Sequence, residues 1–352
     1  MAADPLVAAR CTAQRLAGEP ATSAQDAVRR VLAVQGQDPR GFRLAVRART
    51  AGVAAADLDA GLTDRRSLVV SWLNRGTLHL VAAEDFWWLH ALTTPQLAAT
   101  SLLRLGQEGV TPELAEVGVE VVRREVAEHG SRSRDELRTA VAAAGVPTSG
   151  QALVHVLLAA TLRHRLIRGP VDGGDHRMVL AEDWLGPAPD LPPREVLLAR
   201  LAERYLAAHG PASPRDLATW AGLPLRDARA GLAAIETVPA GDDLVDLPGR
   251  AAPAAPPPRL LGNFDPLLHG WRSRAAVLGA HDAAVVTGGI YRSWAMVDGR
   301  PVVLWRIEGG RIRIAPFAPL PQRTRVALLA DAEAVRAWLA LPDRAPLVLD
   351  PA

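Results

Sequence analysis

The stretch AEHGSRSRDELRTAV (residues 127–141) recurs in outline as AAHGPASPRDLATWA (residues 207–221). In each copy, the pattern predicts that a helix ends at His-Gly and that a serine-led turn starts the next helix. Two occurrences of one plan indicate the fold more strongly than either copy alone. The residues that keep a constant offset of 80 are His129 and His209, Gly130 and Gly210, Ser133 and Ser213, and Leu137 and Leu217.

A third helix and a short glycine-rich hairpin are expected after each copy. The helices are predicted within residues 148–166 and 224–238, and the hairpins within 166–180 and 237–249. A helix, a helix–turn–helix and a two-stranded wing together make a winged helix, a module that most often binds duplex DNA. The N-terminal segment, which has its own helices and the strand-like RGTLHLV, is a candidate for a third, more diverged copy.

The C-terminal part of the chain has a different residue pattern. A proline- and alanine-rich linker, GRAAPAAPPPRLL (249–261), is followed by short alternating runs with Asp-Gly and Gly-Gly turns, which are typical of a β-meander. A closing helix is predicted at 330–341. The expected fold is mainly α with β (α+β), with tandem winged-helix motifs and a small C-terminal β-barrel-like domain. The predicted domains are 1–105, which carries Gln35 and Gln37, then 106–190, 191–250 and 251–352.

Composition permits a nucleic-acid partner without requiring one. The 352 residues carry a net charge of +2, and all 40 basic residues are arginine. A GC-rich coding bias accounts for much of the absence of lysine. Every cationic side chain is nevertheless a planar guanidinium, whose donors suit phosphate oxygens and base edges. One cysteine excludes an intramolecular disulfide, and no apolar run approaches the roughly 20 residues that span a bilayer. With no signal-peptide core at the N-terminus, these features predict a cytoplasmic protein, which a DNA partner would associate with the nucleoid.

The stretch VLAVQGQDPRGFRLAVRART (31–50) places two glutamines at a helix junction. On a continuous helix, residues two apart point about 200° away from each other, so Gln35 and Gln37 would diverge. We therefore expect the preceding helix, capped by Ser23, to end between them at Gly36, and the next to begin at Asp38-Pro39. Two convergent amides offer both acceptors and donors to one small molecule. A capping, turn or surface role for the glutamines is the alternative.

Several arginines fall on elements that winged helices present to phosphates. Arg40, Arg43 and Arg47 share one face of the helix after Asp38. The third helix of the middle copy runs into Arg163, His164, Arg165 and Arg168, and its wing adds Arg177. A solvated arginine face is the alternative to phosphate contacts in each case.

Two further stretches collect polar residues. As a strand, NRGTLHLV (74–81) would put Arg75, Thr77 and His79 on one face, where a purely structural buried network is the alternative. NFDPLLHGWRSR (263–274) could supply polar contacts, although Asp265-Pro266 is also a turn signal. Its candidates are Asp265, His269, Arg272 and Arg274.

The three stretches, in this order and with winged helices between them, resemble the AlkZ/YcaQ-type bacterial DNA glycosylases. The resemblance covers nearly the whole chain, and the Gln-x-Gln and Arg-x-Thr-x-His stretches are its most specific parts. It implies a C-shaped scaffold that excises alkylated purines, in some members by unhooking interstrand crosslinks in producers of DNA-alkylating compounds. The residue between the glutamines, often hydrophobic in the family, is Gly36 here, and DPLLHGWRSR differs from the family's usual stretch.

This resemblance implies that Gln35 and Gln37 are the catalytic pair of a monofunctional, metal-free hydrolase that needs no cofactor. Its expected partner is double-stranded DNA containing alkylated purines, with no membrane and no obligate protein partner. The absence of zinc-type Cys/His spacing and of lysine excludes the usual zinc sites and a lysine Schiff-base lyase. The candidate substrate- and DNA-binding residues are Asp38, Arg40, Arg43, Arg75, Thr77, His79, Arg163, Arg165, Asp265 and Arg272.

Two other functions remain open from the sequence. Tandem winged helices also occur in non-enzymatic DNA-binding proteins such as transcription regulators, and a relative of the glycosylases could bind lesions without excising them. A regulator has no use for a convergent polar site away from its recognition helices, so Gln35 and Gln37 are the residues that discriminate between these functions.

Overall fold

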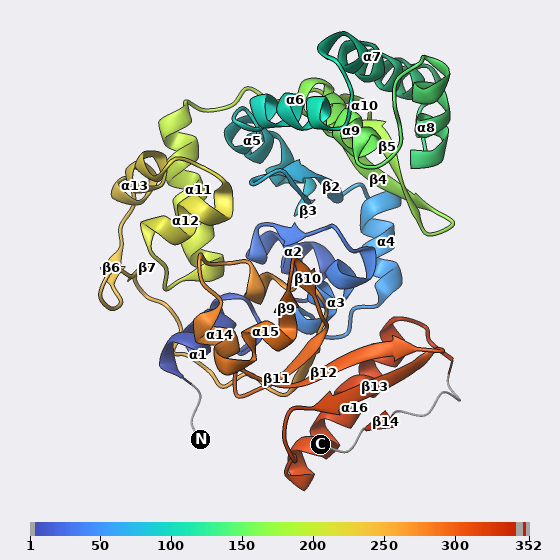
Figure 1. The fold of residues 1–352 in the computed structure, drawn as a ribbon. Coiled ribbons are helices and arrows are strands. Elements are labelled where there is room, and N and C mark those ends of the chain that lie inside the picture. The colour runs from blue at the N-terminus through green and yellow to red at the C-terminus, as the bar shows by residue number, and fades with distance from the viewer. Residues whose placement is uncertain (1–3, 343–347, 350–352) are drawn as a thin grey trace. The chain divides into compact units, whose positions relative to one another are not determined.

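The computed structural model describes residues 4–342 and 348–349, and its elements are labelled in Figure 1. The chain divides into two compact units. Unit 1 holds the described residues up to Leu58 and those from Leu198 onward, and unit 2 holds Asp59–Leu197. Both contain helices and strands, so the mixed α+β class is confirmed. The four predicted domain boundaries stay a prediction.

Unit 2 contains the first copy of the repeat. Its helices are α5 (Ala83–Thr93), α6 (Leu97–Gln107), α7 (Pro112–His129), α8 (Arg134–Ala143), α9 (Ala152–His164) and α10 (Ala181–Leu185), with most of α4 (Ala55–Thr63). Its strands β2 (Leu68–Leu73), β3 (Thr77–Ala82), β4 (Leu166–Asp172) and β5 (Asp175–Leu180) lie side by side in the order β3-β2-β4-β5, each antiparallel to its neighbour. The helix, helix–turn–helix and hairpin expected from the repeat are therefore α7, α8–α9 and β4–β5.

The second copy lies in unit 1. It consists of α11 (Arg194–His209), α12 (Pro214–Ala221), α13 (Leu225–Ala233) and the hairpin of β6 (Val238–Pro239) and β7 (Val245–Asp246). The two copies also share a contact that the sequence did not reveal. Arg132 pairs with Met178 of the β5 strand, and Ala212, again 80 residues later, pairs with Val245 of the β7 strand. In both copies the turn before the second helix is thus bridged to the hairpin, as in a three-stranded wing.

The remaining helices of unit 1 include those around the glutamines. They are α1 (Pro5–Ala13), α2 (Ala24–Val31), α3 (Pro39–Arg49), η1 (Pro266–Leu268), α14 (Ala275–Leu278), η2 (Gly279–His281), α15 (Asp282–Val285) and α16 (Gln322–Trp338). The closing helix therefore begins eight residues earlier than expected, at Gln322, and ends at Trp338. The N-terminal segment has helices α2 and α3 in unit 1 and hairpin β2–β3 in unit 2, so its reading as a third copy stays a prediction.

The C-terminal part of unit 1 forms a sheet in the order β14-β13-β12-β11-β8. Its strands are β8 (Arg259–Leu261), β11 (Trp294–Val297), β12 (Arg300–Glu308), β13 (Arg311–Pro316) and β14 (Val348–Leu349). A small separate hairpin of β9 (Val286–Thr287) and β10 (Ile290–Tyr291) precedes it, and Val34–Gln35 is the short extended segment β1. In the described residues this sheet, expected to be barrel-like, has β14 and β8 as its two edges.

One buried apolar cluster joins the sheet to two helices. Val303 and Ile314 of the sheet pack with Leu328 and Val335 of α16 and with Leu44 of α3. Apolar side chains at a spacing of three to four residues give each helix one face for this core. The core therefore fixes α3, the helix that follows the two glutamines, against the C-terminal sheet within unit 1.

Each copy of the repeat has a reciprocal cap at its second helix. The Ser133 hydroxyl accepts from the Glu136 amide while Glu136 accepts from the Ser133 amide, and Ser213 and Asp216 do the same. We expect Ser133→Ala or Ser213→Ala to lower the free energy of unfolding by about 1 kcal/mol, because an orphaned helix amide loses its acceptor. Urea unfolding followed by circular dichroism measures this; an equal loss for Ser149→Ala, at an exposed serine that caps no helix, would contradict it.

No helix in the part of the chain that the structure describes has both the length and the apolar character required to cross a membrane.

Candidate functional site

The two glutamines converge, but for a different reason from the one expected. Helix α2, capped by Ser23 as expected, ends at Val31, and Leu32 adopts a positive φ of 72°. Gln35 therefore lies in extended backbone rather than at a helix end. The prediction that the helix ends at Gly36 is wrong. In extended backbone, residues two apart point to the same side, which brings Gln35 and Gln37 together.

The two amides are directly hydrogen-bonded. The Gln35 Nε2 donates to Gln37 Oε1 over 2.5 Å. Gln35 is 6% exposed, whereas Gln37 is exposed. Within residues 4–342, the buried Gln35 Oε1 has no hydrogen-bond partner. An unsatisfied buried acceptor costs about 1–3 kcal/mol, so this oxygen is a ready acceptor for an incoming O–H or N–H donor.

Asp38 and Arg40 stand at the start of the next helix. Asp38 is the N-cap of α3 and accepts from the Arg40 amide over 3.0 Å, with Pro39 in the first turn as expected. Arg40 is exposed. The guanidinium of Arg43 donates to the Pro39 carbonyl over 3.0 Å and lies 5.0 Å from the centre of the Phe42 ring. Asp38 thus has the simpler role of a cap, and Arg40 is the cation of this helix that faces solvent.

Arg47 and Asp265, by contrast, are structural. Arg47 is buried and makes two ion-pair hydrogen bonds to Asp331 of α16, so the expected solvent-facing row of Arg40, Arg43 and Arg47 is wrong at its last member. Asp265 is 0% exposed and accepts two bonds, of 2.8 and 2.9 Å, from Arg49, which also donates to Gln14. The prediction that Asp265 contacts DNA is wrong, because its carboxylate is saturated inside the core. Its alternative role as a turn residue is confirmed, since it caps η1.

The Arg75–Thr77–His79 group belongs to unit 2. Strand β3 begins only at Thr77, so Arg75 lies in the turn after β2 rather than on the strand. Thr77 and His79 do share one face, and His79 Nδ1 lies 2.9 Å from the Thr77 carbonyl oxygen. Burial, together with the nearby charge of Arg75, lowers the pKa of His79 to about 3. His79 is therefore neutral at physiological pH and can donate or accept a hydrogen bond but cannot neutralise a phosphate.

Protonation of His79 should destabilise the protein in acid. An unfolded histidine has a pKa near 6.5, so between about pH 6.5 and 3 the unfolded chain binds a proton that the folded chain does not. The stabilisation is complete above pH 6.5 and is lost as the pH falls, by up to about 1.4 kcal/mol per pH unit. Guanidinium unfolding at pH 7 and pH 5 should show a smaller acid loss for His79→Gln than for the unchanged protein. Equal losses in the two proteins would contradict the assignment.

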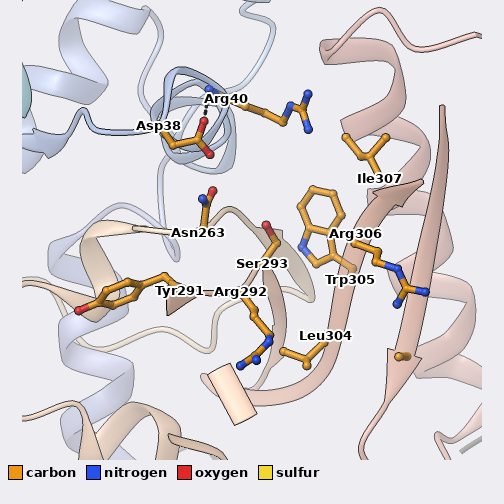
Figure 2. A pocket seen from close by; sticks show the side chains of 11 residues that line it. Asp38, Arg40, Asn263, Tyr291, Arg292, Ser293, Leu304, Trp305, Arg306 and Ile307 are labelled. Atoms are coloured by element: carbon orange, nitrogen blue, oxygen red, sulfur yellow. Dashed lines mark hydrogen bonds between the residues drawn. The ribbon is translucent and has the colours of Figure 1, made fainter. Parts of the chain in front are cut away.

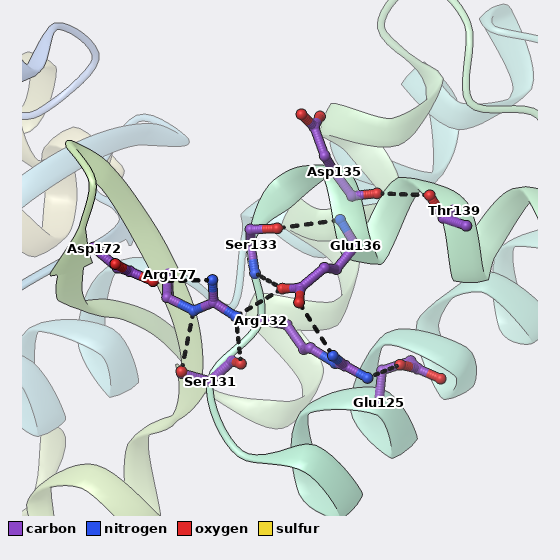
Figure 3. A network of polar contacts seen from close by, with 9 residues as sticks. All are labelled: Glu125, Ser131, Arg132, Ser133, Asp135, Glu136, Thr139, Asp172 and Arg177. Carbon is purple, nitrogen blue, oxygen red and sulfur yellow. Dashed lines mark hydrogen bonds and ion pairs between the residues drawn. The ribbon is translucent and has the colours of Figure 1, made fainter.

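The arginines of the middle copy are engaged with carboxylates. Arg163 pairs with Glu116 and Arg165 with Glu182, while Arg168 stacks on Trp72 at 5.0 Å from its ring. Burial lowers the pKa of Arg168 to about 10. Figure 3 shows that Arg177 of the hairpin is tied to Glu136 of α8 and to Ser131. Arg177 thus fastens the hairpin to α8; the roles of Arg163 and Arg165 on DNA stay predictions.

The NFDPLLHGWRSR stretch has one exposed arginine. Arg272 is exposed, while Arg274 pairs with Asp282. His269 stacks with Phe264 and packs at a tilt against Tyr291, with ring centres 5.9 and 4.7 Å apart. The stretch is therefore mainly a packing element that leaves Arg272 available to a partner.

A cavity of about 500 Å³ opens beside the glutamine segment within unit 1 (Figure 2). Asp38 and Arg40 line it from α3, and Asn263, Tyr291 and Trp305 line it from the C-terminal part. None of these last three residues was predicted to be a site residue from the sequence. Trp305 sits in an alternating strand whose pattern signals a core position, and only the packing of α3 on the sheet places it beside Asp38. Among the residues that the structure describes, no group of three or more His, Cys, Asp or Glu side chains is placed to hold a metal ion.

Comparisons with known proteins place the chain among DNA-repair enzymes. The model of a family described as "DNA glycosylase AlkZ-like" matches residues 28–338. Among solved structures, the chain is similar to the Streptomyces sahachiroi DNA glycosylase AlkZ, at 26% identity and a TM-score of 0.77, covering 99% of this chain and 100% of that one. No curated protein sequence matches.

Proposed function

Because the chain belongs to the AlkZ-like DNA glycosylase family, we propose that it hydrolyses the N-glycosidic bond of purines that carry an alkyl group at N7 or N3. The observation that carries this proposal is the pair of hydrogen-bonded amides, Gln35 and Gln37, with one buried acceptor left unpartnered. Bulky adducts and interstrand crosslinks are included as substrates, and self-resistance to a DNA-alkylating compound is the corresponding biological role.

The chemistry needs only what two amides can supply. An N7- or N3-alkylated purine is already cationic, so it leaves without a general acid. The remaining task is to hold a water at C1′ while positive charge develops on the sugar. A carboxamide is too weak a base to deprotonate water at pH 7, but its oxygen can accept from the water and its NH₂ can donate to it. Positioning of this kind removes several kcal/mol of a barrier.

The Gln35–Gln37 contact pre-orients the pair. The Gln35 NH₂ is engaged by Gln37 Oε1, which leaves the buried Gln35 Oε1 as the acceptor for one water hydrogen. An uncharged pair cannot help an undamaged base to leave, because that base still requires protonation. Selectivity for cationic lesions then follows because the two amides cannot protonate a leaving base.

Contacts to DNA complete the proposal. Arginines along the chain are assigned to phosphate contacts. Such contacts fix the register of the protein on the duplex without reading the base sequence. The exposed Arg40 and Arg272 have the freest access to DNA, and Arg75, Thr77 and the neutral His79 are the proposed DNA contacts of unit 2. The substrate is double-stranded DNA, so the working location is the nucleoid. The further phosphate-binding candidates are Arg43, Arg163 and Arg165.

The test is release of free base from alkylated duplex DNA. The protein is incubated with a duplex that carries N7-methylguanine, and free N7-methylguanine is quantified by mass spectrometry. We expect release with an intact abasic strand, because without lysine there is no amine side chain for a lyase step. Tight operator binding without release of any base would instead support a regulator, and lesion binding without release would support a sensor of damage.

A further inference from the structure

The cavity beside Asp38 is held rigidly to the catalytic segment. Gly41, three residues after Asp38, lies so close to the sheet side that an added Cβ would stand 2.7 Å from the Asn263 carbonyl oxygen. A Cβ on Gly262 would in turn stand 3.2 Å from Gly41 backbone atoms. Two glycines therefore let the first turn of α3 pack directly on the loop that lines the cavity. The cavity wall therefore packs directly on the first turn of α3, which begins two residues after Gln37.

The lining suits a flat aromatic group. Trp305 is held in place because its Nε1 donates to the carbonyls of Leu261 and Trp294, at 2.9 and 3.1 Å. Figure 2 shows Arg40 extending from α3 into the same cavity as the Trp305 indole. Arginine guanidinium planes and indole faces both stack on aromatic rings. Leu304 and Ile307 add apolar wall, and Ser293 and Asn263 add hydrogen-bonding groups.

The charge and the size of the cavity further restrict which ligands it can bind. Asp38 is the single carboxylate among the lining residues, which include three arginines, Arg40, Arg292 and Arg306. The guanidinium of Arg292 donates to the Ala284 carbonyl, and that of Arg306 pairs with Glu308. Pockets of about 300–1,000 Å³ take drug-sized molecules, and about 500 Å³ exceeds what one purine ring system fills. An uncharged or electron-rich aromatic group therefore fits better than a second cation.

We infer that this cavity is a subsite for an aromatic substituent attached to the alkylated purine, seated between Arg40 and Trp305 while Gln35 and Gln37 hold the water at the sugar. The inference rests on the proposed function and deepens it. Asp38, which lines the cavity, directly follows Gln37 in the chain, with Cα atoms about 3.8 Å apart, so the subsite lies next to the proposed water-holding pair. A methyl group cannot, and methylated purines should be cut without using it.

The test fills the cavity from the side opposite the glutamines. Ala315 on β13 lines it, and Ala315→Phe should obstruct it. Single-turnover excision is measured on two duplexes, one with N7-methylguanine and one with N7-benzylguanine. We expect the rate on the benzyl lesion to fall about ten-fold or more while the methyl rate stays within about two-fold. Ala330→Phe, on an exposed position of α16 outside the cavity, should change neither rate.

A smaller substitution keeps the result interpretable. Ala315→Val should give a loss on the benzyl lesion that lies between those of the unchanged protein and Ala315→Phe, and the retained methyl rate reports that the variants are folded. Equal losses on both lesions, or no loss on either, overturn the subsite. Failure of the unchanged protein to release either base overturns the proposed function itself, which is a distinct outcome.

Discussion

Gln35→Ala and Gln37→Ala should each lower the single-turnover rate of N7-methylguanine release by on the order of 100-fold or more, with little change in affinity for DNA. The reason is geometric, since a reacting group misplaced by about 1 Å already costs about 100-fold. Gln35→Ala removes the buried acceptor, and Gln37→Ala removes the oxygen that orients it. Mass spectrometry of the released base and gel-shift titration on an abasic-analogue duplex measure the two quantities separately.

A matched control separates this effect from a general loss of amide groups. Gln322 is an exposed glutamine at the first position of α16, and Gln322→Ala should leave both release and affinity unchanged. Release at the unchanged rate in both Gln35→Ala and Gln37→Ala would remove the catalytic role of the pair. A loss of DNA affinity that matches the loss of rate would reassign the glutamines to binding.

Asp265→Asn should lower the free energy of unfolding by about 3–5 kcal/mol, since removal of one partner leaves the other charge buried and uncompensated. Arg49 is 1% exposed and Asp265 is 0% exposed, so water cannot replace the lost carboxylate. Asp265 also caps η1 through the Leu267 amide, and this bond is weakened in the variant. Denaturant unfolding followed by tryptophan fluorescence measures the loss.

The control is an ion pair on the surface of the same segment. Arg274 and Asp282 are 32% and 46% exposed, and Asp282→Asn should cost less than about 1 kcal/mol. Similar losses for the two variants would show that the Arg49–Asp265 pair is not a buried, uncompensated contact in solution.

Local signals in the sequence predicted the helix starts well. Ser23, Ser133, Ser213 and Asp38 are N-caps as expected, because a cap depends on residues within one turn of itself. The repeat likewise predicted the order of helices and hairpins in both copies. Convergence of Gln35 and Gln37 was predicted through the wrong backbone geometry, since nothing local signals the positive φ of Leu32.

Long-range partners explain the failures. Arg47 and Asp265 carry the residue types of DNA contacts, but their partners Asp331 and Arg49 lie 284 and 216 positions away in the sequence. The cavity is equally non-local, because Asp38 and Trp305 meet only once α3 packs on the sheet. The close approach of Gly41 to Gly262 cannot be predicted from the sequence for the same reason. A glycine that is needed for close packing looks like any other glycine until its neighbour is known.

That glycine pair has a consequence for how the enzyme could acquire new substrates. Because α3 and the Gly262–Asn263 loop approach each other closely at their backbones, insertions or bulkier residues there would displace the start of α3, next to Gln37, along with the cavity wall. Leu304 and Ile307 of β12 and Ala315 of β13 line the cavity by their side chains, away from this backbone approach. Lineages or laboratory libraries selected for a different range of DNA lesions should therefore accumulate changes at 304, 307 and 315, and leave 41 and 262 unchanged.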